Sequence, residues 1–234
     1  MARLNSKPKP AVIGGPRERS RNRKQAIYQQ LRERIIFREL KAGEFINETR
    51  LAADLGVSRT VLREILQRLT SDGLLISTPG QGVYVQGIDL LMVKSAYEMR
   101  IPLEGLAGRL AAERAQPEQL AALREVIRHG EAAAKQKDYR QMAHLDWEFH
   151  RILGEATRNE LLAGTLLRLL MPFNRLWYIA MVDHGKVGNC LEEWREIVTA
   201  LERRAPGNAE KALVEHMTAT PSVISPVLML NPTL

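Results

Sequence analysis

The pair Asp146 and His150 is well suited to hold a metal ion. On a helix, residues four apart project within about 40° of each other, so the carboxylate and the imidazole would converge. Both would lie at the edge of an apolar stripe, which comprises Met142, Phe149, Leu153 and Ala156. Carboxylate oxygens and imidazole nitrogens bind divalent metals. The alternative is a hydrogen-bonded pair in a metal-free pocket, and the spacing alone leaves both open.

A second group of polar side chains, on a helix that begins near residue 59, could read nucleic acid. At about 100° per residue, the polar members share one face and the apolar members an adjacent face. The polar face comprises Arg59, Thr60, Arg63 and Gln67, and the apolar face comprises Leu62, Ile65, Leu66 and Leu69. Arginine pairs with guanine in the major groove, and threonine reaches a phosphate or a thymine methyl group. The alternative is the solvated face of an ordinary core helix.

The segments around this helix predict a winged helix. Apolar residues recur at helical spacing from Gln25 onward. Asn47 and Ser58 are suitable N-caps for a short helix and for the polar-faced helix, and Gly56 suits the left-handed turn between them. Residues 74–85 then read as two strands joined by a turn. Because a tight turn and a wing accompany the polar face, we expect this helix to bind DNA.

The remainder of the chain predicts an antiparallel bundle. After a linker near residues 87–89, apolar residues recur at helical spacing, without strand signals, in six segments. These segments are 92–114, 117–136, 138–157, 159–182, 187–204 and 207–218. The fold class is therefore mainly α, with an N-terminal winged helix-turn-helix and a C-terminal antiparallel six-helix bundle. Three prolines after residue 218 predict an irregular tail over 219–234.

Charge and composition complete the domain division. The net charge is +7, and residues 1–24 alone, with eight basic residues and one acidic residue, account for that value. We expect a disordered basic arm over 1–20, a DNA-binding domain over 21–87 and a ligand-binding and dimerisation domain over 91–218. No apolar run is long enough for a membrane span, and a single cysteine excludes a disulfide framework. We expect a cytoplasmic protein that does not bind membranes.

The stretch 25–85 resembles the DNA-binding domain of GntR-type bacterial transcription regulators. The resemblance depends on a dense motif: Leu55, Gly56, Val57, Ser58, Arg59, Thr60, Leu62, Arg63, Glu64, Leu69, Asp72, Gly73 and Leu74. It implies that Arg59, Thr60 and Arg63 contact operator bases and phosphates and that Gly80, at the wing tip, approaches the minor groove. The family's backbone-clamping arginine falls at Thr49, so we expect a differently aimed contact from Arg50.

Residues 92–218 resemble the helical effector domain of the FadR-like branch of these regulators, and six helices are similar to its VanR-type subgroup. The matching residues are Arg100, Leu103, Glu104, Leu110, Ala111, Ala112, Asp146, Phe149, His150, Leu153 and Asn159. The resemblance implies an effector site that comprises Arg100, Asp146, His150, Asn159 and His216. Arg100 either anchors a carboxylate or forms a solvated pair with Glu104. Spacing does not separate these alternatives, whereas the resemblance favours the anchor, because family effectors are commonly small organic acids.

The resemblance also implies a divalent, zinc-like metal held by Asp146, His150 and His216. The family's fourth ligand, a histidine, falls at Trp194, which cannot ligate a metal, although Glu193 beside it could lean in. Three protein ligands and a water still form a workable site.

We therefore expect a homodimeric, ligand-responsive repressor that binds a palindromic DNA operator and responds to a small organic acid. A metal-dependent enzyme of the helical bundle that uses Asp146, His150 and His216 is the alternative, although the sequence offers no evident general base or nucleophile with a partner.

Overall fold

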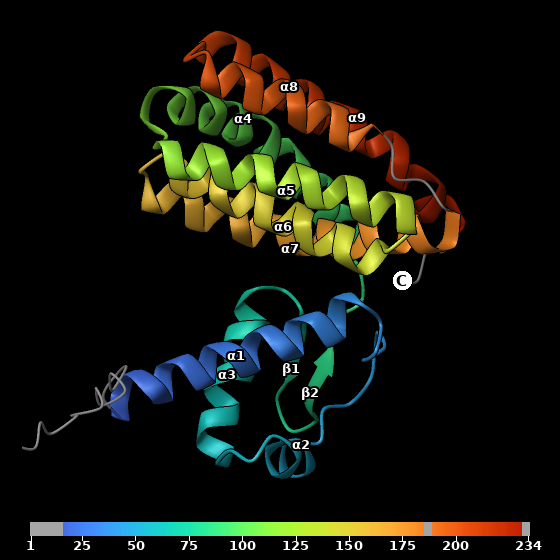
Figure 1. The fold of residues 1–234 in the computed structure, drawn as a ribbon. Coiled ribbons are helices and arrows are strands. Elements are labelled where there is room, and N and C mark those ends of the chain that lie inside the picture. Colours follow the sequence, from blue (N-terminus) through green and yellow to red (C-terminus); the bar gives the residue numbers. More distant parts are fainter. Residues whose placement is uncertain (1–15, 185–188, 231–234) are drawn as a thin grey trace, which may run out of the picture.

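The computed structural model describes residues 16–184 and 189–230. Figure 1 shows two domains, with the N-terminal one below a larger helical one. The elements of the first domain are α1 (Pro16–Ile36), α2 (Glu48–Asp54), α3 (Arg59–Ser71), β1 (Leu75–Thr78) and β2 (Gly82–Val85). Three helices followed by an antiparallel hairpin are the winged helix that the sequence predicts. Within the described ranges, none of the helices is both long enough and apolar enough to span a membrane.

The ends of α2 and α3 are set by the residues that the sequence marks for this role. Asn47 caps α2, since its side-chain oxygen accepts from the Arg50 backbone N–H at 3.0 Å. Ser58 caps α3 in the same way, at 3.3 Å from the Val61 backbone N–H. Between the helices, Gly56 has a φ of 60°, a left-handed conformation that costs glycine little. These local devices fix the tight turn of the helix-turn-helix.

Helix α1 begins at Pro16, earlier than the predicted start at Gln25, so residues 16–20 of the predicted disordered arm are helical. The remainder of the arm, residues 1–15, lies outside the described residues. Proline suits the first turn of a helix, and the arginines that follow are good helix formers. Contacts also hold the part of α1 that precedes Gln25, because Arg23 donates to the Gly56 carbonyl at 2.7 Å and Lys24 pairs with Glu64. Charge patterning shows none of these contacts.

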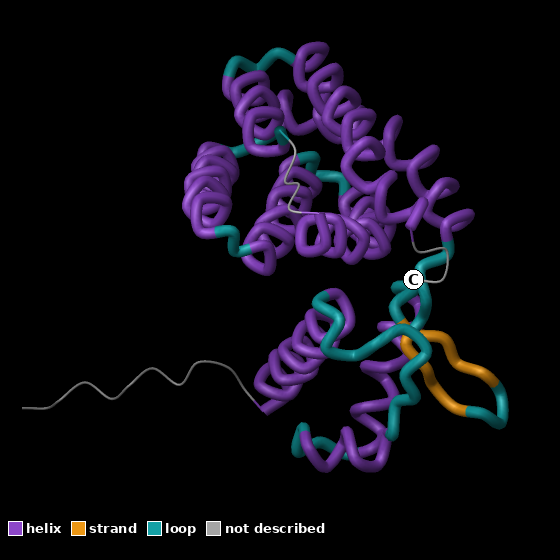
Figure 2. Tube along the Cα trace, turned by 90° about the vertical axis from the view of Figure 1, so that its right-hand side faces the viewer, coloured by secondary structure: helices purple, strands orange, loops and turns teal. Residues whose placement is uncertain are grey.

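The hairpin projects from one side of the first domain (Figure 2). Strands β1 and β2 pair with Leu75 opposite Val85 and Thr78 opposite Gly82. The turn between them contains Gly80, which has a φ of 74° and is exposed. Phe45 lies against Tyr84, with their ring centroids 5.3 Å apart, and supports the base of this wing. The wing tip is therefore displayed to solvent on a braced hairpin.

The second domain consists, within the described ranges, of six helices that agree with the six predicted segments. They are α4 (Leu90–Arg114), α5 (Pro117–Gln136), α6 (Tyr139–Ala156), α7 (Glu160–His184), α8 (Cys190–Glu202) and α9 (Pro206–Leu230). Their buried faces form one large apolar cluster to which all six helices contribute. Helix α6 has an almost wholly buried inner face, which places Asp146 and His150 inside the domain.

Helix α9 continues to Leu230, so the prediction of an irregular tail after residue 218 is wrong as far as residue 230; residues 231–234 lie outside the described residues. Proline removes one backbone donor and crowds the preceding turn, which usually ends or kinks a helix. Here Pro221 and Pro226 lie within α9. The earlier turns of α9 pack along α4 and α8 and provide a folded template from which the helix continues. Sequence rules for proline do not include that support.

The two domains share apolar side chains where they meet. Phe37, just after α1, belongs to the core cluster of the helical domain, and Met171 of α7 belongs to that of the winged helix. Arg175 of α7 donates to the Gln86 carbonyl at 2.5 Å, and Arg38 pairs with Asp183 at 3.3 Å. Side chains of α7 therefore pack directly against the winged helix.

Candidate functional sites

Helix α3 displays the polar face that the sequence predicts. The four apolar side chains of the wheel, Leu62, Ile65, Leu66 and Leu69, are buried in the core of the winged helix. The four polar side chains, Arg59, Thr60, Arg63 and Gln67, are all exposed. Among the residues that the structure describes, Arg59 has no hydrogen bond or ion pair. Its guanidinium is therefore available to an acceptor from outside the protein.

Two other arginines of this surface have partners. Arg63 donates to Glu48 at 2.7 Å, which joins α3 to the first residue of α2 and holds the Arg63 side chain across the helix-turn-helix. Arg50 lies 3.9 Å from Asp54, one turn along α2, and its side chain is 83% exposed. A pair so exposed is weak, so Arg50 can exchange Asp54 for another anion. The residues of the expected DNA contact thus lie on α2, α3 and the wing.

The buried candidate site brings together the three residues predicted from distant segments. Asp146 and His150 of α6 and His216 of α9 have potential ligand atoms within 4.8 Å of one another, and all three residues are buried. His150 Nε2 lies 3.9 Å from Asp146 Oδ1, and the two imidazole rings stack with centroids 5.7 Å apart. The donor set of one carboxylate and two imidazoles fits a zinc-type ion with an open coordination position.

Each imidazole of this cluster faces a second carboxylate. Glu104 of α4 lies 3.1 Å from His150 Nδ1, and Glu193 of α8 lies 2.6 Å from His216 Nδ1. A carboxylate that accepts the Nδ1 proton leaves Nε2 as the nitrogen that can ligate a metal. Glu193 therefore does approach the cluster, but its carboxylate contacts His216. His216 thus has the carboxylate–histidine arrangement by which proteins orient metal ligands, whereas His150 Nδ1 lies near Glu104 without a hydrogen bond to it.

Arg100 is held by Glu104 rather than projecting as a separate anchor. Arg100 donates to Glu104 at 2.8 Å, and both side chains are almost fully buried. The Arg100–Glu104 pair therefore exists but is not solvated, in contrast to the form expected from spacing. Burial alone would raise the pKa of Glu104, but the His150 imidazole and the Arg100 guanidinium overcome this and hold the pKa at about 2. Glu104 is thus a carboxylate that links Arg100 to His150.

Trp194 occupies the place where the family resemblance expects a fourth ligand. It is fully buried, and its indole lies nearly parallel to the Phe149 ring at a centroid distance of 4.8 Å. Asn174 of α7 donates to the Ala143 carbonyl at 2.9 Å and to Asp146 Oδ2 at 3.4 Å, which orients that carboxylate. Sequence reasoning missed Asn174 and the role of Glu104, and only the four-residue spacing from Arg100 pointed to the latter.

Asn159, expected in the effector site, lies at the start of α7. Its side-chain oxygen accepts from the Leu162 backbone N–H at 3.1 Å, so Asn159 caps this helix. In the described part of the chain it makes no hydrogen bond to Asp146, His150 or His216. The capping contact accounts for an asparagine at this position without a ligand.

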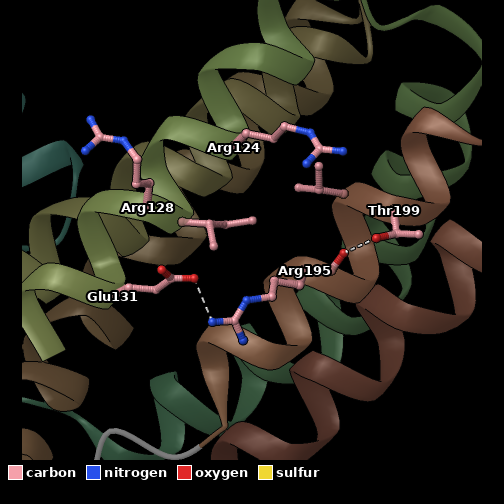
Figure 3. A pocket seen from close by; sticks show the side chains of 7 residues that line it. Arg124, Arg128, Glu131, Arg195 and Thr199 are labelled. Carbon is pink, nitrogen blue, oxygen red and sulfur yellow. Dashed lines mark hydrogen bonds and ion pairs between the residues drawn. The ribbon is translucent and has the colours of Figure 1, made fainter. Parts of the chain in front are cut away.

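A separate pocket lies on the outside of the helical domain, between α5 and α8 (Figure 3). Its cations already have acidic partners: Arg195 pairs with Glu131 at 2.8 Å and Arg128 with Glu125 at 2.7 Å, whereas Arg124 pairs with Glu202. These exposed pairs leave little unmet charge in the pocket. We therefore do not take this pocket as the effector site.

Comparison with known protein families divides the chain as the fold does. Residues 23–85 match the family model "Bacterial regulatory proteins, gntR family", and residues 95–219 match the model of the FCD domain. The first match covers the winged helix, and the second covers the helical domain from α4 into α9. The two candidate sites lie in different matched regions.

Individual proteins extend these matches. The chain is 31% identical over 206 residues to a protein of Paenarthrobacter nicotinovorans named "Probable D-xylose utilization operon transcriptional repressor", which covers 82% of this chain and 86% of that protein. It is 41% identical over 127 residues to the Nta operon transcriptional regulator of Aminobacter aminovorans, which covers 52% of this chain but only 58% of that protein. The solved structure of E. coli McbR/YncC superposes with a TM-score of 0.77 at 21% identity, covering 88% of this chain and 98% of that one, and so shares the fold.

Proposed function

The chain belongs to the GntR family of bacterial regulatory proteins and carries an FCD domain, and from that premise we propose a repressor that binds a palindromic operator as a homodimer and responds to a small organic acid. Membership makes the chain a DNA-binding transcription regulator and not an enzyme, so the metal-dependent enzyme alternative is set aside. The six helices of the FCD domain support a place in the FadR-like branch and its VanR-type subgroup. The proposal sets the protein in the cytoplasm, where bacterial operators lie.

The exposed polar face of α3 carries the DNA part of the proposal. Because Arg59 has no partner among the described residues and Arg63 is held by Glu48, both guanidinium groups can be presented to guanine edges in a major groove. Thr60 and Gln67 extend the face, Arg50 reaches the backbone beside it, and Gly80 lets the wing tip approach the minor groove without a side chain.

Self-association is supported by apolar side chains left exposed on α4 and α7, two helices of the bundle that pack against each other. These are Leu91, Met92, Met99, Leu161 and Val182. Met92 and Met99, seven residues apart, share one face of α4, and exposed apolar side chains on one face can be buried against a second protein surface. A two-fold dimer would present two α3 helices to the two halves of a palindrome.

The buried cluster is the proposed effector site. A divalent metal held by Asp146, His150 and His216 would supply a positive centre for a carboxylate. Among the described residues, four buried polar atoms at this cluster lack a hydrogen-bond partner: Arg100 Nε, Glu104 Oε2, His150 Nδ1 and Trp194 Nε1. Trp194 Nε1 can donate to an organic acid. The positive charge of Arg100 offsets the negative charge of Glu104, which limits the negative charge around the bound acid. The repressor assignment is supported by the name of the relative from Paenarthrobacter nicotinovorans.

The substitution Arg63→Ala tests the DNA-reading face. We expect a loss of about 1 to 3 kcal/mol on a palindromic operator selected from random duplexes, with relaxed preference at one base pair in each half-site. Fluorescence anisotropy on operator and random duplex measures both, and Arg203→Ala, which removes an exposed arginine of the other domain, is the matched control. An unchanged ratio of operator to random binding in Arg63→Ala would refute the assignment.

A further inference from the structure

A second cavity lies where the two domains meet, away from the buried cluster. Its volume is about 380 Å³, and it is bounded by α1 and α3 of the winged helix and by α6 and α7 of the FCD domain. Four arginines and two carboxylates line it: Arg32, Arg68, Arg151, Arg168, Asp72 and Glu155. The lining is therefore cationic, and a ligand in this cavity would touch both domains.

Arg32 is a buried cation in this lining, and the described residues that its guanidinium contacts directly are neutral. It is 3% exposed, its guanidinium lies 4.5 Å from the centroid of the Trp147 ring, and it donates to Gln29 and to Met171 Sδ, each at 3.2 Å. Among the described residues no carboxylate forms an ion pair with it. Burial lowers the pKa of Arg32 to about 10, so the group remains charged at neutral pH. The carboxylates of Glu33 and Asp72 attract this charge through space but do not contact it. A buried cation without a carboxylate in contact is costly, which makes this position receptive to an anion.

Within the described ranges, Trp147 adds an unpaired hydrogen-bond donor to the cavity. Its indole Nε1 is buried and has no hydrogen-bond partner in the described structure, although the ring lines the same cavity and stacks on Arg32. Leaving a buried N–H without an acceptor forfeits the free energy of a hydrogen bond. An acceptor oxygen in the cavity would satisfy this N–H and the Arg32 charge together.

The other charges of the lining divide into engaged and available groups. Arg151 pairs with Glu155 at 2.8 Å, Asp72 accepts from Tyr28 at 2.6 Å, and Arg68 donates to Gln25 at 2.7 Å. Arg168 is exposed, and within the described part of the chain it donates only to the Thr165 hydroxyl, at 3.3 Å. The pocket of Figure 3 differs, because each of its arginines already has a carboxylate.

We propose that this junction cavity is a second ligand site, which binds a small oxyanion, a carboxylate or a phosphate group, through Arg32, Trp147 and Arg168. The anion would contact α1 through Arg32 and α6 and α7 through Trp147 and Arg168, and so bind the winged helix to the FCD domain. Trp147 follows Asp146 in α6, but Asp146 faces the interior whereas Trp147 packs against the core of the winged helix. An anion that favours one orientation of the winged helix would thereby alter DNA affinity.

The test uses the full chain and two probes, inorganic phosphate and malonate, in isothermal titration calorimetry at matched ionic strength with chloride as the reference. Trp147→Phe keeps a ring for Arg32 but removes the N–H, and we expect roughly tenfold weaker binding with no loss of thermal stability in the anion-free protein. Arg168→Gln removes an exposed cation and should weaken binding severalfold. Arg128→Gln, the same change in the pocket of Figure 3, should leave the affinity unchanged.

His150→Ala separates this site from the buried cluster. We expect it to bind both probes as the unaltered protein does, whatever becomes of the effector site. Saturation by phosphate but not malonate would identify the ligand class as phosphorylated, and the reverse result would identify it as a carboxylate. The proposal would be overturned by the absence of saturable binding of either probe, or by binding that Trp147→Phe and Arg168→Gln leave unchanged. Binding lost in His150→Ala but kept in Trp147→Phe would also overturn it and would place the anion at the cluster.

Discussion

The DNA-reading face and the buried cluster are assembled in opposite ways. The face takes Arg59, Thr60, Arg63 and Gln67 from one short stretch of α3, and all four side chains point to solvent. The cluster takes its ligands from α6 and α9 and the carboxylates that orient them from α4 and α8. A site on one helix needs only that helix to be placed, whereas a site on four helices needs the packed bundle. Substitutions should therefore act locally in the first site and through neighbours in the second.

The largest expected effect is on stability and tests whether the two regions fold separately. Leu69→Ala removes a fully buried side chain of α3 and should destabilise the winged helix by about 2 to 5 kcal/mol. Trp177 and Trp194 lie in the core of the FCD domain, whereas Trp147 packs against the winged helix. In a Trp147→Phe background, fluorescence therefore reports the FCD domain, whereas far-UV circular dichroism reports both domains. In urea, we expect the circular dichroism signal of Leu69→Ala to begin to change at lower urea concentrations, so that its transition becomes broader. The midpoint of the fluorescence transition should shift little.

Leu153→Ala, a fully buried position of α6, is the matched control and should shift the fluorescence transition most. Equal shifts of both probes in Leu69→Ala would mean that the exchange of Phe37 and Met171 between the cores makes the two domains one cooperative unit. The DNA-reading face would then depend on the packed helical bundle as much as the buried cluster does.

The same contrast explains what could be read from the sequence. Caps and turns act within a few residues, so Asn47, Gly56 and Ser58 predict the ends of α2 and α3 correctly. Contacts between elements have no such local signal. The start of α1 at Pro16 and the continuation of α9 through Pro221 oppose local expectations, and packing against other elements accompanies both.

The buried site shows this limit most clearly. Helical spacing pairs Asp146 with His150, but His216 entered through family resemblance, because no periodicity connects α6 with α9. Arg100 has two chemically reasonable partners at the level of sequence, an effector or Glu104. The choice depends on burial, which brings Glu104 against both Arg100 and His150. Spacing gives the candidates, and tertiary packing selects among them.

An intermediate effect is expected at the carboxylate that orients His216. Glu193→Gln replaces the carboxylate that accepts the Nδ1 proton with a neutral amide, and loss of the charged partner should weaken zinc binding by about 10- to 100-fold. Competition with a chromogenic chelator measures the affinity, His150→Ala marks the loss of a ligand, and Glu192→Gln changes an exposed neighbour on the same helix. Unchanged zinc affinity in Glu193→Gln would show that the helix holds His216 without this carboxylate. No zinc binding by the unaltered chain would remove the metal from the proposal.

The smallest expected effect concerns the basic N-terminus. Arg23 donates to the Gly56 carbonyl and Lys24 pairs with Glu64, so both side chains already have partners within the winged helix. The arginine and lysines among residues 1–15 are Arg3, Lys7 and Lys9. If these cations bind phosphates, deletion of residues 1–15 should reduce the slope of log affinity against log salt by at most about three and weaken binding severalfold at low salt.

Because phosphate contacts carry no base information, the ratio of operator to random binding should stay constant after this deletion. A full-length variant with glutamine at positions 3, 7 and 9 controls for chain length and should reproduce the change in slope. A slope that is unaltered in both variants would show that basic residues after residue 15 make all the ionic contacts. A changed ratio would show instead that the arm reads sequence, and the DNA site would then depend on residues beyond one helix and its wing.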